Sequence, residues 1–433
     1  MSDTGRSRFK NEEYTVGWIC ALPVELAAAK AMMDELHGDP QRSPGKADAN
    51  VYVLGSMNNI KIVLACLPID EPGPSSAAVV AKDMFYTFPE IQIGLLVGVG
   101  AGIPHFSSDN IRDIRLGDVV IGFNEDDSGV VAYDLGKKLA DGSFKNYALN
   151  GPPGPLRSAV AALRAQHQVR GNKIPHYIEE MLGKRPYMRR KGYSYPFQVP
   201  DRLFRPDYVH VGGRDCTRCD PKAEINREDL SRSETGTDPV IHYGTIATGG
   251  TLVKNGIFRE EIGKRYGAIC LEMEAEGLMN IYPCIVIRGI SDYADSHKNN
   301  LWRAYAAAAA AACTKELLEH LQHTQIEERS ISWQDHAQVS QLYKVSMTHQ
   351  PLNAPSCTSP VELDSLQQCV PCHQQFETGL WLLRSNELCT WVDALRRNWF
   401  CAGNRTTGRA ITPKAVVERP YHFAQARRRT LSI

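Results

Sequence analysis

The chain has 433 residues, enough for one large domain or two ordinary ones, because single hydrophobic cores rarely grow beyond about 250 to 300 residues. Hydrophobic residues make up 43% and charged residues 23%, and 49 Lys and Arg residues balance 49 Asp and Glu residues, so nothing indicates a nucleic-acid partner. The N-terminus lacks the apolar segment of a signal peptide, and no stretch reaches the roughly 18 apolar residues of a spanning helix. We therefore expect a cytoplasmic protein without a membrane partner.

Twelve cysteines are scattered along the chain, and without an export signal reduced thiols are the better expectation. Two CxxC pairs occur, at Cys216/Cys219 and at Cys369/Cys372. A four-thiolate zinc site that joins the two pairs is a minor alternative. The main expectation is that the protein needs no metal and no organic cofactor.

The first hundred residues alternate between strand-like and helix-like patterns. We predict residues 1–13 to be disordered. A strand at 14–22 and a helix at 23–36 follow, and two strands within 50–67 flank Met57-Asn58-Asn59. A helix at 75–88 and a buried strand at 91–100 come next. Alternation of this kind indicates an α/β sheet.

The next long stretch, residues 135–237, is rich in Gly, Pro, Lys and Arg and has one clear helix at 158–167, so we interpret it as an insertion. Regular structure then returns with apolar and helical segments at 240–250, 257–266, 268–279 and 283–295, and with an Ala-rich helix at 301–323. We expect this helix to close a catalytic domain of residues 14–325. Residues 326–375 are predicted to form a linker.

Several carboxylates follow apolar runs, and strand ends are where α/β proteins place ligands. The run at 283–290 ends in Ser291 and Asp292, and an acid at the edge of a dry cleft can hold a proton. Glu25 comes just after the first strand, where a carboxylate facing the same cleft could act as a base toward water. Taken alone, an Asp after a strand is more often a helix cap or a turn residue.

Glu272, Met273 and Glu274 follow another apolar strand. Two carboxylates around a flexible apolar side chain suit a sugar, which has hydroxyls to bind and a ring face to cover. The alternative for each is ordinary: a lone Glu is usually solvated and a lone Met usually belongs to the core.

The strand at 91–100 runs into GVGAGIP, with glycines at 98, 100 and 102. A side chain at such positions would block the close approach of a ligand to the backbone. The spacing differs from that of a dinucleotide-binding fingerprint.

These motifs identify a family only when they are taken together. LEMEAEGL followed by VIRGISDYAD, with VGVGAGIP and RLGDVVIG upstream, resembles the nucleoside phosphorylase and nucleosidase superfamily, and CALPVE, YVHVGG, HYG and RGISDYADSHKN make it most similar to the fungal form of that domain. The resemblance covers residues 14 to about 322. It implies a three-layer fold, with a central mixed twisted sheet flanked by helices.

The resemblance also implies roles for individual residues. Asp292 matches the general acid that protonates, or hydrogen-bonds, N7 of a purine, and Ser291 would orient Asp292 or the base. Glu274 matches the carboxylate that holds the ribose hydroxyls, while Met273 packs under the sugar and Glu272 supports the geometry. The glycine-rich turn that lines the pocket is matched by Gly100, Ala101 and Gly102.

The nucleophile separates the two activities of the superfamily. Phosphorylases carry an Arg after the first strand, whereas nucleosidases carry a Glu near that place, as this chain does at Glu25. We therefore expect hydrolysis of a purine nucleoside or nucleotide of the adenine type, with a phosphate-dependent phosphorylase as the alternative. Leu252 and Val253 stand where bacterial nucleosidases have a Phe that stacks on the base, and this loss favours a third possibility, a nucleoside-sensing domain with weak turnover.

Two further expectations follow from the resemblance. Superfamily members commonly form dimers, trimers or hexamers, so we expect a homo-oligomer. The Lys and Arg residues of 135–237 could reach the phosphates of a nucleotide, although a solvated basic loop is the simpler interpretation.

The tail at 376–433 resembles the start of a NACHT-type NTPase module. Its GNRTTGRA places Arg409 and Ala410 where a phosphate-binding loop has Lys and Ser or Thr. The magnesium ligand is thereby lost, so we predict a degenerate or truncated module without NTPase activity.

Overall fold

The computed structural model describes residues 7, 9–41, 48–107, 111–124, 128–213, 215–227, 237–281 and 284–321. The predicted linker at 326–375 and the NACHT-like tail at 376–433 lie outside these residues.

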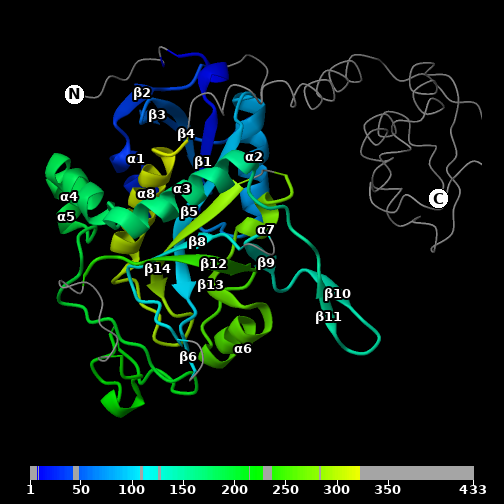
Figure 1. Ribbon diagram of the computed structural model, residues 1–433, viewed down its shortest axis with the longest axis vertical. Coiled ribbons are helices and arrows are strands. Elements are labelled where there is room, and N and C mark those ends of the chain that lie inside the picture. Colours follow the sequence, from blue (N-terminus) through cyan, green and yellow to red (C-terminus); the bar gives the residue numbers. More distant parts are fainter. Residues whose placement is uncertain are drawn as a thin grey trace, which may run out of the picture. The chain divides into compact units, whose positions relative to one another are not determined.

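The described residues contain one ten-stranded mixed sheet (Figure 1). Its strands follow the order β13 (Ala268–Glu272), β12 (Ile241–Thr248), β8 (Val119–Gly122), β14 (Cys284–Asp292), β5 (Ile93–Gly102), β1 (Val16–Cys20), β4 (Ile60–Cys66), β3 (Tyr52–Met57) and β2 (Glu35–Gly38), and β9 (Val130–Ala132) pairs with β12. The expected mixed α/β architecture is confirmed.

Parallel pairing at the centre of the sheet sets the position of the strand ends. β14, β5, β1 and β4 run parallel to one another, so their carboxyl ends lie at the same edge. β13 also pairs with β5, in the antiparallel sense, and this contact closes β13, β12, β8, β14 and β5 into a ring.

Helices cover both faces of the sheet. One face carries α1 (Pro23–Met32), α3 (Gly154–Arg170), α4 (Ile174–Lys184) and α8 (Arg303–Leu318), with α5 (Pro186–Arg190) beside α4. The other face carries α2 (Pro74–Thr87) and α7 (Ala275–Leu278), while α6 (Gly256–Tyr266) packs near β12 and β13. None of the described helices combines the length and the apolar character needed to cross a bilayer.

The smaller elements lie around this frame. They are the hairpins β6 (His105–Phe106) with β7 (Ile111–Arg112) and β10 (Gly136–Lys138) with β11 (Phe144–Asn146), and the short helices η1 (Asn11–Glu13) and η2 (Pro221–Ala223). Figure 1 shows the β10–β11 hairpin extending away from the sheet.

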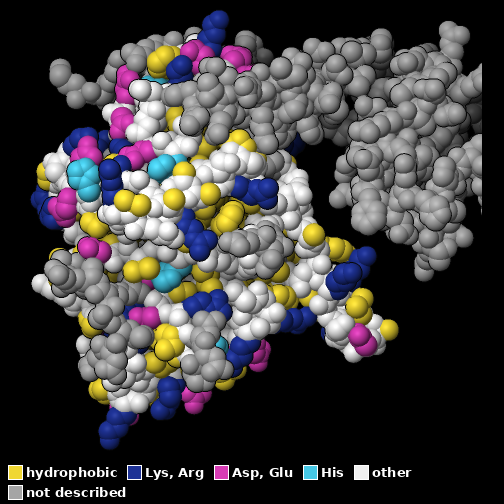
Figure 2. All heavy atoms as spheres, viewed as in Figure 1, with side chains coloured by type: hydrophobic (Ala, Val, Ile, Leu, Met, Phe, Trp, Pro, Cys, Tyr) yellow, Lys and Arg dark blue, Asp and Glu magenta, His cyan; other side chains and the backbone are white. Residues whose placement is uncertain are grey.

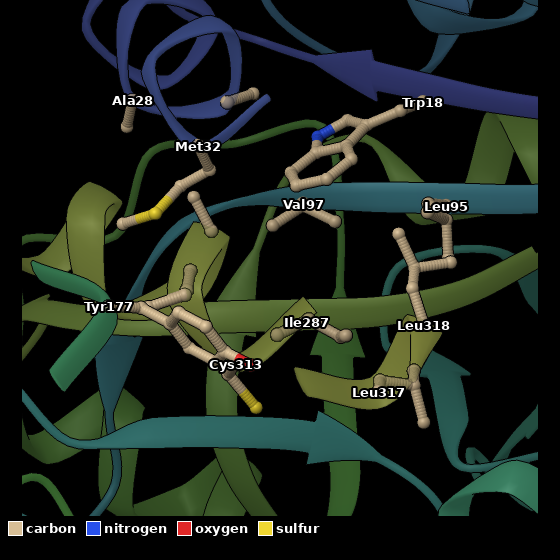
Figure 3. Close-up of a cluster of buried hydrophobic side chains, with 14 of the residues drawn as sticks. Trp18, Ala28, Met32, Leu95, Val97, Tyr177, Ile287, Cys313, Leu317 and Leu318 are labelled. Carbon is tan, nitrogen blue, oxygen red and sulfur yellow. The ribbon is translucent and has the colours of Figure 1, made fainter. Parts of the chain in front are cut away.

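The central strands are apolar on both faces, as parallel strands covered by helices must be. Leu95 and Val97 of β5 and Ile287 of β14 face α1 and α8, whereas Leu96 and Val286 face α2 and α7. Figure 3 shows Trp18, Val97 and Ile287 packed with Met32 of α1, Tyr177 of α4 and Leu317 and Leu318 of α8. The long apolar runs of the sequence therefore form the core strands of the sheet.

The Ala-rich helix α8 lies close to the sheet because its contact residues are small. Ala306 to Ala312 are all buried, and a methyl group added at Gly289 of β14 would collide with the backbone of Ala306. Gly289 thus allows strand and helix to touch backbone to backbone. This contact fixes the position of β14, the strand that ends in Asp292.

Two local expectations differ from the structure. The helix predicted at 23–36 ends at Met32, because Glu35–Gly38 instead pair with β3 as an edge strand. The residues predicted as a disordered N-terminus include η1, where the Asn11 side chain donates hydrogen bonds to the carbonyl oxygens of Gln41 and Thr87.

The stretch interpreted as an insertion, 135–237, contributes more than one helix. Its α3 and α4 pack on α8 and supply Leu156, Leu163, Ile178 and Met181 to the main core. Part of this stretch is therefore integral to the sheet's helical layer, although its high content of polar residues hid that role.

We predict that Gly289→Ala lowers the free energy of unfolding by about 1–3 kcal/mol or more, because the added methyl group overpacks the contact between β14 and α8. Gly183→Ala in α4 is the matched control, since an added methyl group there meets no atom within 4 Å. Alanine is the better helix former, so the control should gain up to about 1 kcal/mol. Urea unfolding of both variants measures the difference, and equal stabilities would contradict the packing account.

Candidate active site

The ends of three strands meet around Ala101 of β5. Asp292 of β14 pairs with Ala101 on one side, and Leu271 of β13 pairs with it on the other. Because β13 runs antiparallel to β5, the residues that follow Leu271 continue toward Gly100 and toward Arg288 of β14, which contacts Glu272 and Glu274. The register of the strands brings together two acidic motifs that are separate in the sequence.

Arg288 of β14 is at the centre of the acidic residues. It is fully buried, and its Nη2 group donates hydrogen bonds to Glu272 and, at 3.1 Å, to Glu274. Burial alone would lower the pKa of Arg288, but Glu272, Glu274 and Glu25 together raise it above its ordinary value. The guanidinium is therefore a permanent positive charge that is buried at the edge of the sheet.

Glu25 lies on the first turn of α1, directly after β1. Its carboxylate accepts hydrogen bonds from the backbone N–H groups of Ala21, Leu22 and Val99 at 2.8–2.9 Å, and the residue is 3% exposed. Burial raises the pKa of Glu25, while Arg288 and these N–H groups oppose the rise. A side chain at Gly98 would collide with this carboxylate, so the glycine is needed where it stands.

Glu272 and Glu274 have different surroundings. Glu272 accepts hydrogen bonds from the backbone N–H groups of Glu274 and Ala275 at 3.1–3.2 Å, which fix the start of α7. Glu274 has Arg288 as its charged partner. The pKa of Glu274 is raised to about 7, chiefly by burial, while Arg288 lowers it and Glu272 and Glu25 raise it. Glu274 therefore changes its charge near neutral pH.

Asp292 is 5% exposed and is held by three groups. The Ser291 hydroxyl donates to Oδ2 at 2.9 Å, the Ala294 N–H donates to Oδ1 at 3.0 Å, and Nζ of Lys298 lies 2.5 Å from Oδ2. The Ser291 hydroxyl also lies 3.4 Å from the carbonyl oxygen of Gly100, which ties Asp292 to β5.

The glycines of the predicted turn are required by close packing. A side chain at Gly100 would meet Cys270 and Arg288, and one at Gly102 would meet Ile290 and Ile114. These glycines are therefore explained by the contacts of β5 with β13 and β14. A bound ligand is not needed to explain them.

The two neighbours expected at the purine base, Leu252 and Val253, differ in their burial. Leu252 is 51% exposed, whereas Val253 packs against an apolar cluster that includes Ala101 and Leu271. Met273, which was expected under the sugar, is partly buried. Tyr133, which sequence reasoning missed, packs against the same cluster.

Two charged residues of the site were also missed. Arg288 and Lys298 both stand inside motifs that the sequence analysis quotes, VIRGISDYAD and RGISDYADSHKN. The available signal was an Arg within an otherwise apolar strand, since a buried Arg needs acidic partners.

Several basic residues of 135–237 pair with acidic partners. Arg189 pairs with Glu179 at 2.9 Å and Arg202 with Glu224 at 2.6 Å. Figure 2 shows basic and acidic side chains interspersed around α4 and α5. For the paired residues, a solvated surface is the simpler interpretation.

One group of side chains in the described part of the chain has the composition of a metal site. His210, Cys216 and Cys219 offer ligand atoms that all lie within 4.8 Å of one another. Cys369 and Cys372, the second CxxC pair, lie outside the described residues.

No protein-family model matches the chain. Over 310 residues, 71% of the chain, it is 42% identical to a nucleotide-binding leucine-rich repeat (NLR)-like protein of Hyaloscypha variabilis, of which the match covers 29%. Over 87 residues, 19% of the chain, it is 32% identical to the ATP nucleosidase Cap17 of Escherichia coli, of which the match covers 17%. The chain thus spans less than a third of the length of these relatives.

Two solved structures are similar to the chain at low identity. Futalosine hydrolase of Helicobacter pylori is 16% identical, with 71% of this chain and 99% of the hydrolase covered and a TM-score of 0.43. The 5′-methylthioadenosine/S-adenosylhomocysteine nucleosidase of Neisseria meningitidis is 19% identical, with 71% and 99% covered and a TM-score of 0.45. In sequence, the chain is therefore similar to an NLR-like protein over most of its length and to an ATP nucleosidase over a shorter stretch.

Proposed function

We propose that the protein hydrolyses the N-glycosidic bond of a purine nucleoside or nucleotide of the adenine type. The observation that carries this proposal is the convergence of Glu25, Glu272 and Glu274 around Arg288 of β14, the strand that ends in Asp292. The similarity to an ATP nucleosidase supports an adenine nucleotide as substrate.

Asp292 is proposed to assist the leaving base. Its side chain is oriented by Ser291 and Ala294, so it presents one fixed carboxyl group to N7 of the purine. Lys298 is close enough to pass a proton to Asp292 or to stabilise its carboxylate after the proton has left. A protonated or hydrogen-bonded N7 makes the base a better leaving group.

Glu274 and Met273 are proposed to hold the ribose. An ionised Glu274 accepts hydrogen bonds from ribose hydroxyls and places negative charge near the cationic sugar that forms as the bond breaks. Glu272 acts as a positioning residue, because its hydrogen bonds hold the backbone of Glu274 and Ala275.

Glu25 is proposed as the base that activates water. The raised pKa of this buried carboxyl brings it toward the range in which a general base is effective. Nε and Nη1 of Arg288 have no hydrogen-bond partner among the described residues, so they could orient the attacking water.

Phosphorolysis is the second candidate, since the free N–H groups of Arg288 could also hold a phosphate oxygen. Three carboxyl groups share the electrostatic surroundings of Arg288, and they would repel a phosphate dianion. This arrangement favours water over phosphate as the nucleophile, and therefore hydrolysis over phosphorolysis.

The purine base is proposed to lie against the apolar cluster that contains Ala101, Val253 and Tyr133. Tyr133 provides an aromatic ring in a region where Leu252 is exposed. Its hydroxyl donates to the carbonyl oxygen of Thr251 at 3.2 Å, which holds the ring against the loop after β12.

We predict that Asp292→Asn lowers the rate of base release by about 10²–10⁴, because the amide cannot supply the proton that the leaving base needs. Chromatography of the free base from ATP, adenosine, methylthioadenosine and inosine measures this effect and ranks the substrates. Asp141→Asn is the matched control, since Asp141 is exposed and its hydrogen bonds within the described part of the chain are local ones to Ser143. An Asp292→Asn variant as active as the control would remove Asp292 from the mechanism.

A second prediction concerns the charge of Glu274. Because its folded-state pKa of about 7 exceeds the ordinary value of 4.5, the protonated form fits the folded protein better. The resulting stability is present below pH 4.5 and is lost as the pH rises through 7. Relative to Glu274→Gln, the wild-type free energy of unfolding should fall by about 3 kcal/mol across this window. Urea unfolding at several pH values tests this, and parallel pH curves for the two proteins would contradict it.

A further inference from the structure

The loop that carries His210, Cys216 and Cys219 is a small folded unit with very little core. It is closed at its base by hydrogen bonds from Arg205 N–H to the Ala223 carbonyl and from Ile225 N–H to the Leu203 carbonyl. Its buried apolar cluster consists of Phe204, Cys219 and Ala223. So small a core provides little hydrophobic stabilisation, and units of this kind usually need a disulfide or a metal ion.

The geometry points to a Zn²⁺ site formed by His210, Cys216 and Cys219. Their ligand atoms lie within 4.8 Å of one another, and the ligands of a tetrahedral zinc ion stand roughly 3.5–3.8 Å apart. Movements of about 1 Å would therefore complete the coordination. Two thiolates and an imidazole form a soft ligand set that selects zinc over magnesium or calcium.

The local backbone already holds the two cysteines in a suitable turn. The Cys219 N–H donates to the Cys216 carbonyl at 3.1 Å, so both sulfur atoms leave the same turn. Gly212 and Gly213 have φ angles of 100° and 104°, which let the chain reverse between His210 and Cys216.

Among the described residues, the hydrogen-bond contacts of the two His210 ring nitrogens are with the backbone of the same loop. Nε2 lies 3.0 Å from the Asp215 carbonyl oxygen, and the Gly212 N–H approaches Nδ1 at 3.1 Å. Nδ1 is the nitrogen suited to the metal, because it exchanges the Gly212 contact for a coordinate bond while the Nε2–H group still donates to the Asp215 carbonyl and orients the ring. Binding through Nε2 would leave the proton on Nδ1, which could then no longer accept from the Gly212 N–H.

A second imidazole stands beside the proposed ligands. His297 is 7% exposed, and its ring stacks on the Phe204 ring with 4.1 Å between the ring centroids. The centroids of the His297 and His210 rings are 5.4 Å apart. Neither of its nitrogens has a hydrogen-bond partner among the described residues, and the nearest acidic oxygen, on Asp295, is 3.5 Å away. His297 does not belong to the group whose ligand atoms lie within 4.8 Å of one another, and its ring is stacked on Phe204, so water is the expected fourth ligand.

The site adjoins the segment that follows Asp292. The His210 N–H donates to the Ser296 hydroxyl oxygen at 2.9 Å, and Lys298 comes two residues later. A zinc ion here would fix the loop of 203–225 against 293–298, so we assign it a structural role that supports the position of Lys298. Zinc binding displaces the protons of the two thiols and involves no change of oxidation state.

The test is zinc content, measured by mass spectrometry on the full chain without a polyhistidine tag, after zinc loading and desalting. Wild type should hold one zinc ion per chain, and Cys216→Ser/Cys219→Ser should hold none. Cys369→Ser/Cys372→Ser and His176→Gln, an exposed histidine on α4, are the matched controls and should keep the metal. His210→Gln should bind zinc more weakly than His176→Gln.

Cobalt substitution of the wild type gives a second readout that needs no variant to fold. Tetrahedral cobalt with two thiolates should show intense visible bands and thiolate charge-transfer absorption. Absence of zinc from the loaded wild type, retention of zinc by Cys216→Ser/Cys219→Ser, or its loss from Cys369→Ser/Cys372→Ser would overturn the assignment. A disulfide between Cys216 and Cys219 in protein purified under reducing conditions would do the same.

Discussion

The burial of Arg288 among acidic side chains is the interaction on which the candidate site depends. A guanidinium with no exposed surface is tolerated only when carboxylates compensate its charge, and removing one partner from such a cluster costs about 3–5 kcal/mol. Glu272 and Glu274 supply direct contacts, and Glu25 contributes through space. Burial raises the pKa of Glu274 to about 7 against the lowering by Arg288, and Glu272 and Glu25 add to the rise.

The fold places these groups by backbone pairing and by close contact between elements. β14 carries both Arg288 and Asp292, and its position is fixed by pairing with β5 and by the contact of Gly289 with α8. The antiparallel pairing of β13 with β5 adds the glutamates from the opposite side. The site is therefore built on the rigid part of the sheet, as a preorganised catalytic site requires.

Much of this arrangement could be predicted from the sequence, because long apolar runs such as 91–100 and 283–290 specify buried strands and the acids directly follow them. The burial of Arg288 and the proximity of Lys298 could not, since both depend on which strands pair and on how the chain turns after Asp292. α1 ends early for a similar reason: Glu35–Gly38 gain more by pairing with β3 than by extending a helix. His210 lies six residues before Cys216, and only the fold of that loop brings it to the cysteines.

The central claim is that water, activated by Glu25, attacks the sugar. The most direct test separates the products formed by the wild type and by Glu25→Gln in phosphate-free buffer and in buffer with phosphate. The account predicts free base and a sugar without a phosphate on its anomeric carbon, at rates independent of phosphate, and a large loss of rate in Glu25→Gln. Base release that requires phosphate and yields a sugar 1-phosphate would contradict it.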